Sequence, residues 1–159
     1  MKTIVIGLGN PILGDDGIGW RVVEQVTEEL ENRPQNGNSG TIETECLAVG
    51  GLTLMEHLIG YERAILVDAI TTGKVPDGTV RSFPIEALPN LAIGHFSSAH
   101  DTTLQNAIDM GRRMGAQLPE EIEIVAIEAQ QIYDFSEELS TPVSNALPKA
   151  VKTVKELLL

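Results

Sequence analysis

Residues 7–19, GLGNPILGDDGIG, constrain the fold of this chain more than any other stretch. They follow an apolar run at residues 4–6 and lead into a segment whose apolar residues recur with helical spacing. Those apolar residues are Ile18, Val22, Val26 and Leu30. The pattern therefore predicts a buried strand, a glycine-rich turn and a helix within about thirty residues. Glycine suits such a turn because it tolerates positive φ and close backbone approach.

The rest of the chain continues the alternation of strands and helices. Strands are predicted at residues 2–6, 41–49, 64–67, 79–83 and 121–127. Helices are predicted at residues 15–32, at 52–59, from 100 onward and from 140 to the C-terminus. The connection before residues 79–83 is too short for a parallel crossover, so this strand is predicted to be antiparallel. Pro148 predicts either a kink in the last helix or a later start of it.

This order of elements predicts an α/β fold. We expect residues 1–159 to form a single domain, a three-layer α/β/α sandwich with a mixed, mostly parallel five-stranded sheet. Residues 2–6 are apolar without alternation, which indicates a strand buried on both faces. Only 4% of the residues are aromatic, so the core must consist mainly of Ile, Val, Leu and Ala.

The composition excludes several classes of partner. The chain carries 23 acidic against 11 basic residues, a net charge of −12, which argues against binding to nucleic acid or to an anionic membrane surface. No apolar run approaches the length of a membrane span or a signal peptide. Cys46 is the single cysteine, so no intrachain disulfide can form and a cytoplasmic location is expected.

Three polar residues are predicted to meet at one edge of the sheet. Asp16 lies in the loop after the first strand, and Asp68 ends the third strand. His100 begins the helix that runs back before the fifth strand, so it should reach the same edge. Ligands of open α/β sheets bind at the carboxyl ends of the strands. The topology therefore predicts a site that contains Asp16, Asp68 and His100.

Two carboxylates and one imidazole form a donor set that suits Zn, Ni, Mn or Fe and leaves positions open for substrate or water. Purely structural interpretations remain open for the same residues. Asp15 and Asp16 could cap the following helix, and His100 could be a helix-start histidine. Asp68 is harder to explain structurally, because a carboxylate that ends an apolar strand usually has a partner.

Two other motifs favour structural interpretations. Gly7-Leu8-Gly9 resembles the start of a dinucleotide-binding fingerprint, but Ile12 stands where the third glycine should be, so this hypothesis fails. Cys46 lies in an apolar strand with nothing nearby that would lower its pKa, which favours a core residue over a nucleophile.

Taken together, the motifs resemble those of the hydrogenase maturation endopeptidases. The opening stretch of residues 7–19 carries the resemblance first. The Gly50-Gly51 turn, the strand ending in Asp68, residues 98–100 (SAH) before a helix, and residues 139–148 (LSTPVSNALP) follow in the same order. The resemblance covers essentially the whole chain.

This resemblance implies an endopeptidase that removes a C-terminal peptide from the large subunit of a nickel-iron hydrogenase after nickel insertion. The family's metal-contacting residues fall on Asp16, Asp68 and His100, where many relatives carry Glu at the first position. The implied partner is the large-subunit precursor, which presents the nickel, and no permanently bound cofactor is expected. The metal, or one of the carboxylates acting as a base, would help water attack the scissile carbonyl.

Two alternatives remain open at this point. Peptidyl-tRNA hydrolase also opens with a GLGNP-type turn, but it needs an electropositive surface and an early histidine, whereas the first histidine here is His57. A non-catalytic module that binds nickel or docks on the precursor could use the same three residues.

Overall fold

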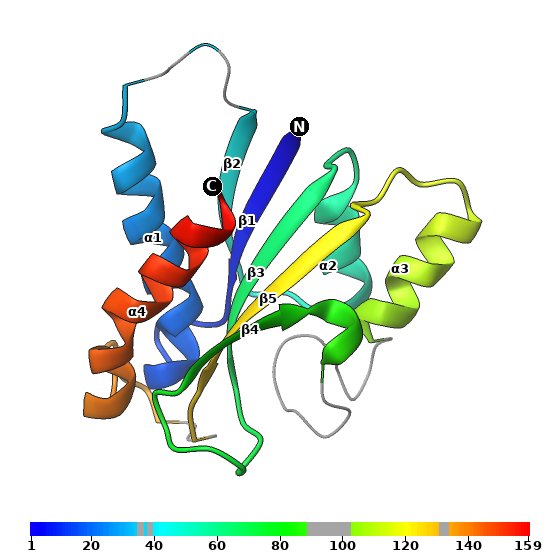
Figure 1. Cartoon of the computed structure of the whole chain (residues 1–159). Helices are drawn as coiled ribbons and strands as arrows, with labels where there is room; N and C mark the ends of the chain where they lie inside the picture. The colour runs from blue at the N-terminus through cyan, green and yellow to red at the C-terminus, as the bar shows by residue number, and fades with distance from the viewer. Residues whose placement is uncertain (35–36, 38–39, 89–102, 131–133) are drawn as a thin grey trace.

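The computed structural model describes residues 1–34, 37, 40–88, 103–130 and 134–159 (Figure 1). The strands are β1 (Lys2–Leu8), β2 (Thr41–Leu47), β3 (Arg63–Ile70), β4 (Val80–Pro84) and β5 (Glu121–Glu128). The helices are α1 (Ile18–Glu31), α2 (Gly51–Leu58), α3 (Leu104–Arg113) and α4 (Thr141–Leu157), with the short 3₁₀ helices η1 (Gly14–Gly17) and η2 (Ile85–Ala87).

The five strands form one sheet in the order β2-β1-β3-β5-β4. The pairs β1–β2, β1–β3 and β3–β5 are parallel, and β4 runs antiparallel to β5. The predicted mixed, mostly parallel sheet is therefore confirmed. The antiparallel strand pairs with β5, although β3 precedes it in the chain.

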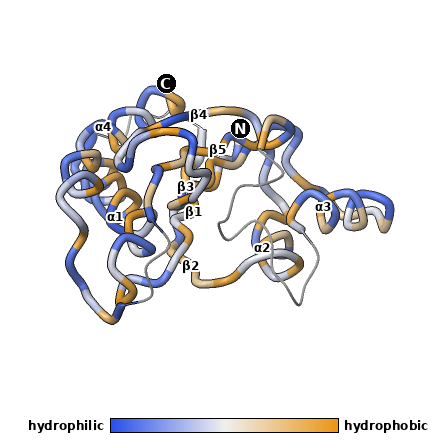
Figure 2. Tube along the Cα trace, turned by 90° about the horizontal axis from the view of Figure 1, so that it is seen from below, coloured by the Kyte–Doolittle hydropathy of each residue, from blue (hydrophilic) through white to orange (hydrophobic). Residues whose placement is uncertain are grey.

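Helices cover both faces of the sheet, as the sequence predicts. α1 and α4 lie on one face and α2 and α3 on the other (Figures 1 and 2). Along β1, Ile4 and Ile6 pack into the core shared with α2 and α3, whereas Val5 packs into the core shared with α1 and α4. Burial on both faces explains why the sequence of this strand is a continuous apolar run.

Among the element boundaries that differ from the prediction, two concern the predicted site. β3 continues to Ile70, so Asp68 lies inside the strand and does not end it. α3 begins at Leu104, where the Thr103 hydroxyl accepts a hydrogen bond from the Asn106 N–H (3.2 Å) as an N-cap. The predicted start at His100 lies outside the described residues.

Pro148 lies inside α4, which begins at Thr141 as the Ser-Thr-Pro start signal predicts. The later start is therefore wrong. Pro148 cannot donate to the carbonyl of Ser144, and both residues are exposed, so water can satisfy that carbonyl. None of the helices in the described ranges is long and apolar enough to cross a membrane.

Candidate active site

The N-terminal end of α1 packs directly on the carboxyl ends of β1 and β3. A Cβ atom on Gly19 would lie 2.5 Å from the Leu8 carbonyl oxygen and would also overlap the carbonyl oxygen of Val67. A Cβ atom on Gly7 would lie 2.5 Å from the Gly19 carbonyl oxygen. Only glycine fits these positions, so they bring the loop that precedes α1 against the residues next to Asp68.

That loop folds back on itself over residues 9–16. Gly9 has a φ of 131°, and a side chain there would overlap the backbone carbonyl of Asp16. The Asp16 Oδ2 atom accepts a hydrogen bond from the Asn10 N–H at 2.8 Å. Asp16 lies in the first turn of η1, and neither η1 nor α1 has a side-chain N-cap. The Asp16 carboxylate therefore braces the glycine-rich loop, and the N-cap interpretation is wrong.

Asp15 contacts a different helix from the one it was expected to cap. Its Oδ1 atom accepts from the Ser140 N–H and its Oδ2 atom from the Ser140 hydroxyl, both at 2.7 Å. Ser140 is the N-cap residue of α4. The Asp15 carboxylate thus sits at the positive end of the α4 dipole, where a negative charge is stabilising.

Backbone hydrogen bonds join the same two segments. The Gly14 N–H donates to the Ser136 carbonyl (2.7 Å), and the Ser136 N–H donates to the Ile12 carbonyl (2.9 Å). Leu13 and Ser136 form an isolated parallel bridge. This pairing could not be predicted from local sequence patterns, because it joins parts of the chain more than a hundred residues apart.

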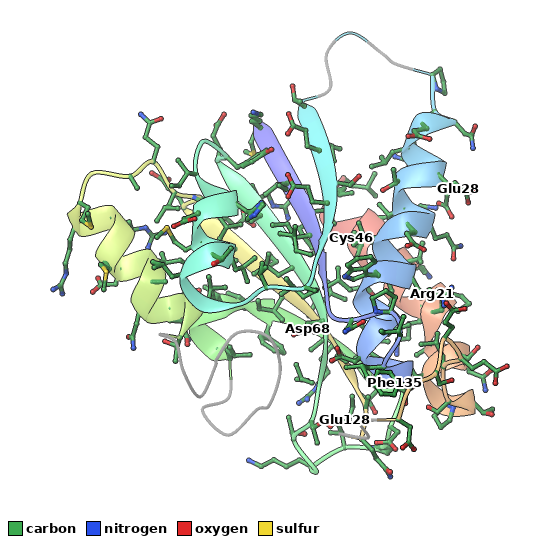
Figure 3. The ribbon with its side chains drawn as sticks, turned by 180° about the vertical axis from the view of Figure 1, so that it is seen from behind. Arg21, Glu28, Cys46, Asp68, Glu128 and Phe135 are labelled. Carbon is green, nitrogen blue, oxygen red and sulfur yellow. The ribbon has the colours of Figure 1, made fainter. Side chains whose placement is uncertain are left out.

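Asp68 is fully buried in β3, with an exposed fraction of 0%. Its strand neighbours on the same face, Leu66 and Ile70, belong to the core under α2 and α3. η1 contacts β3, and Figure 3 shows Asp68 at the carboxyl end of the sheet. The predicted convergence of the Asp16 loop and Asp68 at one edge is therefore observed.

His100 lies outside the described residues, so its predicted place beside the two carboxylates stays a prediction. Among the residues that the structure does describe, no group of three or more His, Cys, Asp or Glu side chains could hold a metal ion.

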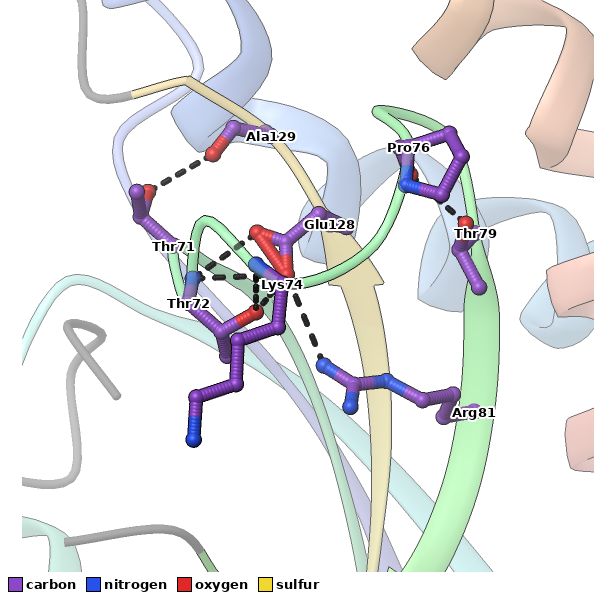
Figure 4. A network of polar contacts seen from close by, with 8 residues as sticks. All are labelled: Thr71, Thr72, Lys74, Pro76, Thr79, Arg81, Glu128 and Ala129. Atoms are coloured by element: carbon purple, nitrogen blue, oxygen red, sulfur yellow. Dashed lines mark hydrogen bonds and ion pairs between the residues drawn. The ribbon is translucent and has the colours of Figure 1, made fainter. Parts of the chain in front are cut away.

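A second buried carboxylate, Glu128, ends β5 on the same face of the sheet as Asp68 and is 2% exposed. It accepts hydrogen bonds from the N–H of Thr72 (2.8 Å) and from the Thr72 hydroxyl, and pairs with Arg81 at 3.5 Å (Figure 4). The Thr71 hydroxyl donates to the Ala129 carbonyl at 2.7 Å. These contacts hold the β3–β4 connection against β5.

The sequence analysis did not identify Glu128. Like Asp68, it is a carboxylate near the carboxyl end of an apolar strand, so the same pattern could have found it. The strand was expected to end at Ile127. Its contacts with Thr72 and Arg81 favour a structural role for Glu128.

Cys46 is half-buried between β2 and α1, where its thiol faces the Trp20 carbonyl at 3.9 Å. Burial, and then the nearby carboxylate of Glu24, raise the pKa of Cys46 to about 11. A thiol with so high a pKa is a poor nucleophile at neutral pH. The prediction that Cys46 is not catalytic agrees with this environment.

Comparison with known proteins identifies the family of this chain. The family model for hydrogenase maturation proteases matches residues 20–157. The chain belongs to the hydrogenase maturation protease family. The match includes the later motifs of the resemblance, whereas the glycine-rich loop at residues 7–19 lies directly before the matched range.

Individual relatives are similar in sequence to this chain along nearly its whole length. A hydrogenase expression/formation protein, HoxM, of Cupriavidus necator is 27% identical over 98% of this chain and 73% of its own length. A putative hydrogenase maturation protease of Methanocaldococcus jannaschii is 29% identical over 95% of this chain and 92% of its own.

Solved structures show the same fold. The hydrogenase maturating endopeptidase HybD from E. coli has a TM-score of 0.75 at 24% identity, covering 99% of this chain and 92% of its own. The [NiFe] hydrogenase maturation protease HybD from Thermococcus kodakarensis has a TM-score of 0.67 at 26% identity and covers both chains completely. The chain is therefore a peptidase of hydrogenase maturation, and the peptidyl-tRNA hydrolase alternative is wrong.

Proposed function

We propose that this protease removes a C-terminal peptide from the large-subunit precursor of a nickel-iron hydrogenase after nickel has been inserted. Asp16, Asp68 and His100 contact the nickel that the precursor presents. The observation that carries this proposal is the packing of the Asp16 loop against the carboxyl end of β3, next to the buried Asp68. The single cysteine is consistent with a reaction in the cytoplasm.

The chemistry of the three side chains supports nickel as the recognised element. Carboxylates and imidazole are both ligands of divalent first-row metals, and nickel accepts such mixed oxygen and nitrogen sets. Because Asp68 is fully buried, packing restricts the conformations that its side chain can adopt. A metal ion that belongs to the substrate would then align the scissile peptide relative to the protein before any bond is broken.

Hydrolysis requires a water molecule, an acceptor for its proton and stabilisation of the oxyanion. In the proposed reaction the carboxylate of Asp16 or Asp68 takes the proton from the attacking water. The substrate's nickel acts as the Lewis acid at the carbonyl oxygen. The departing amine receives the proton, so the products are the shortened subunit and a free C-terminal peptide.

The decisive experiment is a processing assay with the cognate large-subunit precursor, prepared with and without nickel. We expect the mass of the subunit to fall by that of a short C-terminal peptide only in the nickel-loaded sample. Cleavage of both forms would contradict the role of nickel, and cleavage of neither would overturn the proposed reaction. The Asp109→Asn variant, which changes an exposed acid on α3, serves as the control and should process normally.

A further inference from the structure

We propose that Ile12 and Phe135 form an apolar contact surface for the precursor segment beside the scissile bond, and that they help to select the substrate. This inference rests on the proposed function. The surface would accept an apolar side chain of the substrate that lies close in sequence to the bond being cut.

The first observation is exposure. Phe135 is 85% exposed and Ile12 is 46% exposed, although both are large apolar side chains. Removing such surface from water is favourable, and a monomer gains nothing by displaying it. Exposure alone does not identify a binding site, because Met114 is 82% exposed as well, so the placement of the two residues decides.

The second observation is that the backbones at the two residues run alongside each other. Ile12 and Phe135 directly precede Leu13 and Ser136, which form a parallel bridge. The Ser136 N–H donates to the Ile12 carbonyl at 2.9 Å, which fixes this register. In addition, the Ile12 N–H donates to the Asn10 side chain at 3.2 Å. The surface is thus built by hydrogen bonds between two segments distant in the sequence.

The third observation is position. Ile12 belongs to the same folded loop as Asp16, whose carboxylate accepts from the Asn10 N–H. Figure 3 shows Phe135 at the carboxyl end of the sheet, as it shows Asp68. Since an extended peptide advances about 3.3 Å per residue, a substrate held at Asp16 reaches this surface within a few residues.

The side chains that flank Phe135 in the sequence are mostly acidic. Phe135 is flanked by the exposed acids Asp134, Glu137 and Glu138 in a chain of net charge −12. A complementary substrate segment carries basic residues next to its apolar side chain. Docking of that segment should therefore weaken as the salt concentration rises.

Met114 is an exposed apolar side chain that lacks this context. Met114 is 82% exposed, but it follows α3 at the opposite, amino edge of the sheet. It therefore provides a matched control for the loss of an exposed apolar side chain away from the site.

The test measures kcat and KM for processing of the nickel-loaded precursor by Ile12→Ser, Phe135→Ser and the double variant. We expect KM to rise about tenfold for Phe135→Ser, and kcat to stay within about twofold, because the contact is made equally in the ground and transition states. Phe135→Leu should restore most of the affinity, and Met114→Ser should match the wild type. Thermal unfolding checks that each variant is folded.

The outcomes separate this inference from the proposed function. If the wild type cleaves the precursor and both serine variants retain its KM, the apolar surface has no role and the inference is wrong while the proposed function stands. A fall in kcat alone, with KM unchanged, would also overturn it. If the wild type cleaves no precursor, the proposed function fails and the inference falls with it.

Discussion

The carboxylate of Asp15 is bound through both oxygen atoms by Ser140, a residue 125 positions later in the chain. The contact joins the loop after β1 to the N-cap residue of the last helix. Asp16 is the next residue in the chain, so we expect the position of its carboxylate to depend on this anchor. Asp15, which by sequence could cap the helix that follows it, contacts the N-terminus of α4 instead.

Loss of this anchor should be measurable in unfolding. We expect Asp15→Ala to lower the free energy of unfolding by about 1–3 kcal/mol, since it leaves the Ser140 backbone donor without its charged acceptor. Ser140→Ala removes one of the two bonds and should cost about 1 kcal/mol. Urea denaturation gives both values. Glu138→Ala, an exposed acid in the same segment, should leave stability unchanged, and an equal loss there would contradict the anchor.

The three proposed nickel contacts can be tested one at a time. Asp16→Ala, Asp68→Asn and His100→Ala should each reduce processing of the nickel-loaded precursor by at least about a hundredfold. Asp68→Asn keeps the shape of a fully buried side chain and removes only its charge. Circular dichroism should show a native fold in each variant. Processing by Asp68→Asn at the wild-type rate would refute a shared site.

Glu128 should matter for stability. Glu128→Ala leaves Arg81 and the Thr72 N–H without their buried acceptor, so we expect a loss of about 3 kcal/mol. Breaking the exposed pair of Lys152 and Glu156 by Glu156→Ala should cost less than about 0.5 kcal/mol. Chemical denaturation of the two variants under identical conditions makes the comparison. Equal losses of unfolding free energy in the two variants would contradict a larger contribution of the buried Glu128 network.

Close backbone approach at Gly19 predicts a severe effect of a single methyl group. Gly19→Ala would drive a Cβ atom into the carbonyl oxygens of Leu8 and Val67, so the start of α1 must shift. We expect a loss of about 3 kcal/mol or more and impaired processing. Gly37→Ala is the matched control, since a Cβ there meets no atom within 4 Å. A stable, active Gly19→Ala variant would contradict the packing.

The raised pKa of Cys46 predicts slow alkylation. With a pKa of about 11, this thiol holds roughly a hundredfold less thiolate at pH 8 than a thiol with a pKa near 9. The rate of reaction with iodoacetamide should therefore still be rising above pH 10 in the native protein and should increase sharply in urea. Cys46→Ser should process normally. Fast alkylation at pH 8 would show that the thiol is not shielded.

Local sequence patterns predicted the elements and the edge of the sheet at which the Asp16 loop and Asp68 lie. Apolar runs and turn residues located the strands, and the parallel order brought Asp16 and Asp68 to one edge. Pairing between distant segments was not predictable in the same way. The hydrogen bonds of Asp15 with Ser140, and the pairing of β4 with β5, depend on which segments meet in space, and no local period encodes that.

The tie between Asp15 and Ser140 also sets an order of events during synthesis. The glycine-rich loop leaves the ribosome before its partner segment at residues 136–140 has been made. In the nascent chain Asp15 therefore lacks its serine partner until that segment, more than a hundred residues later, has emerged.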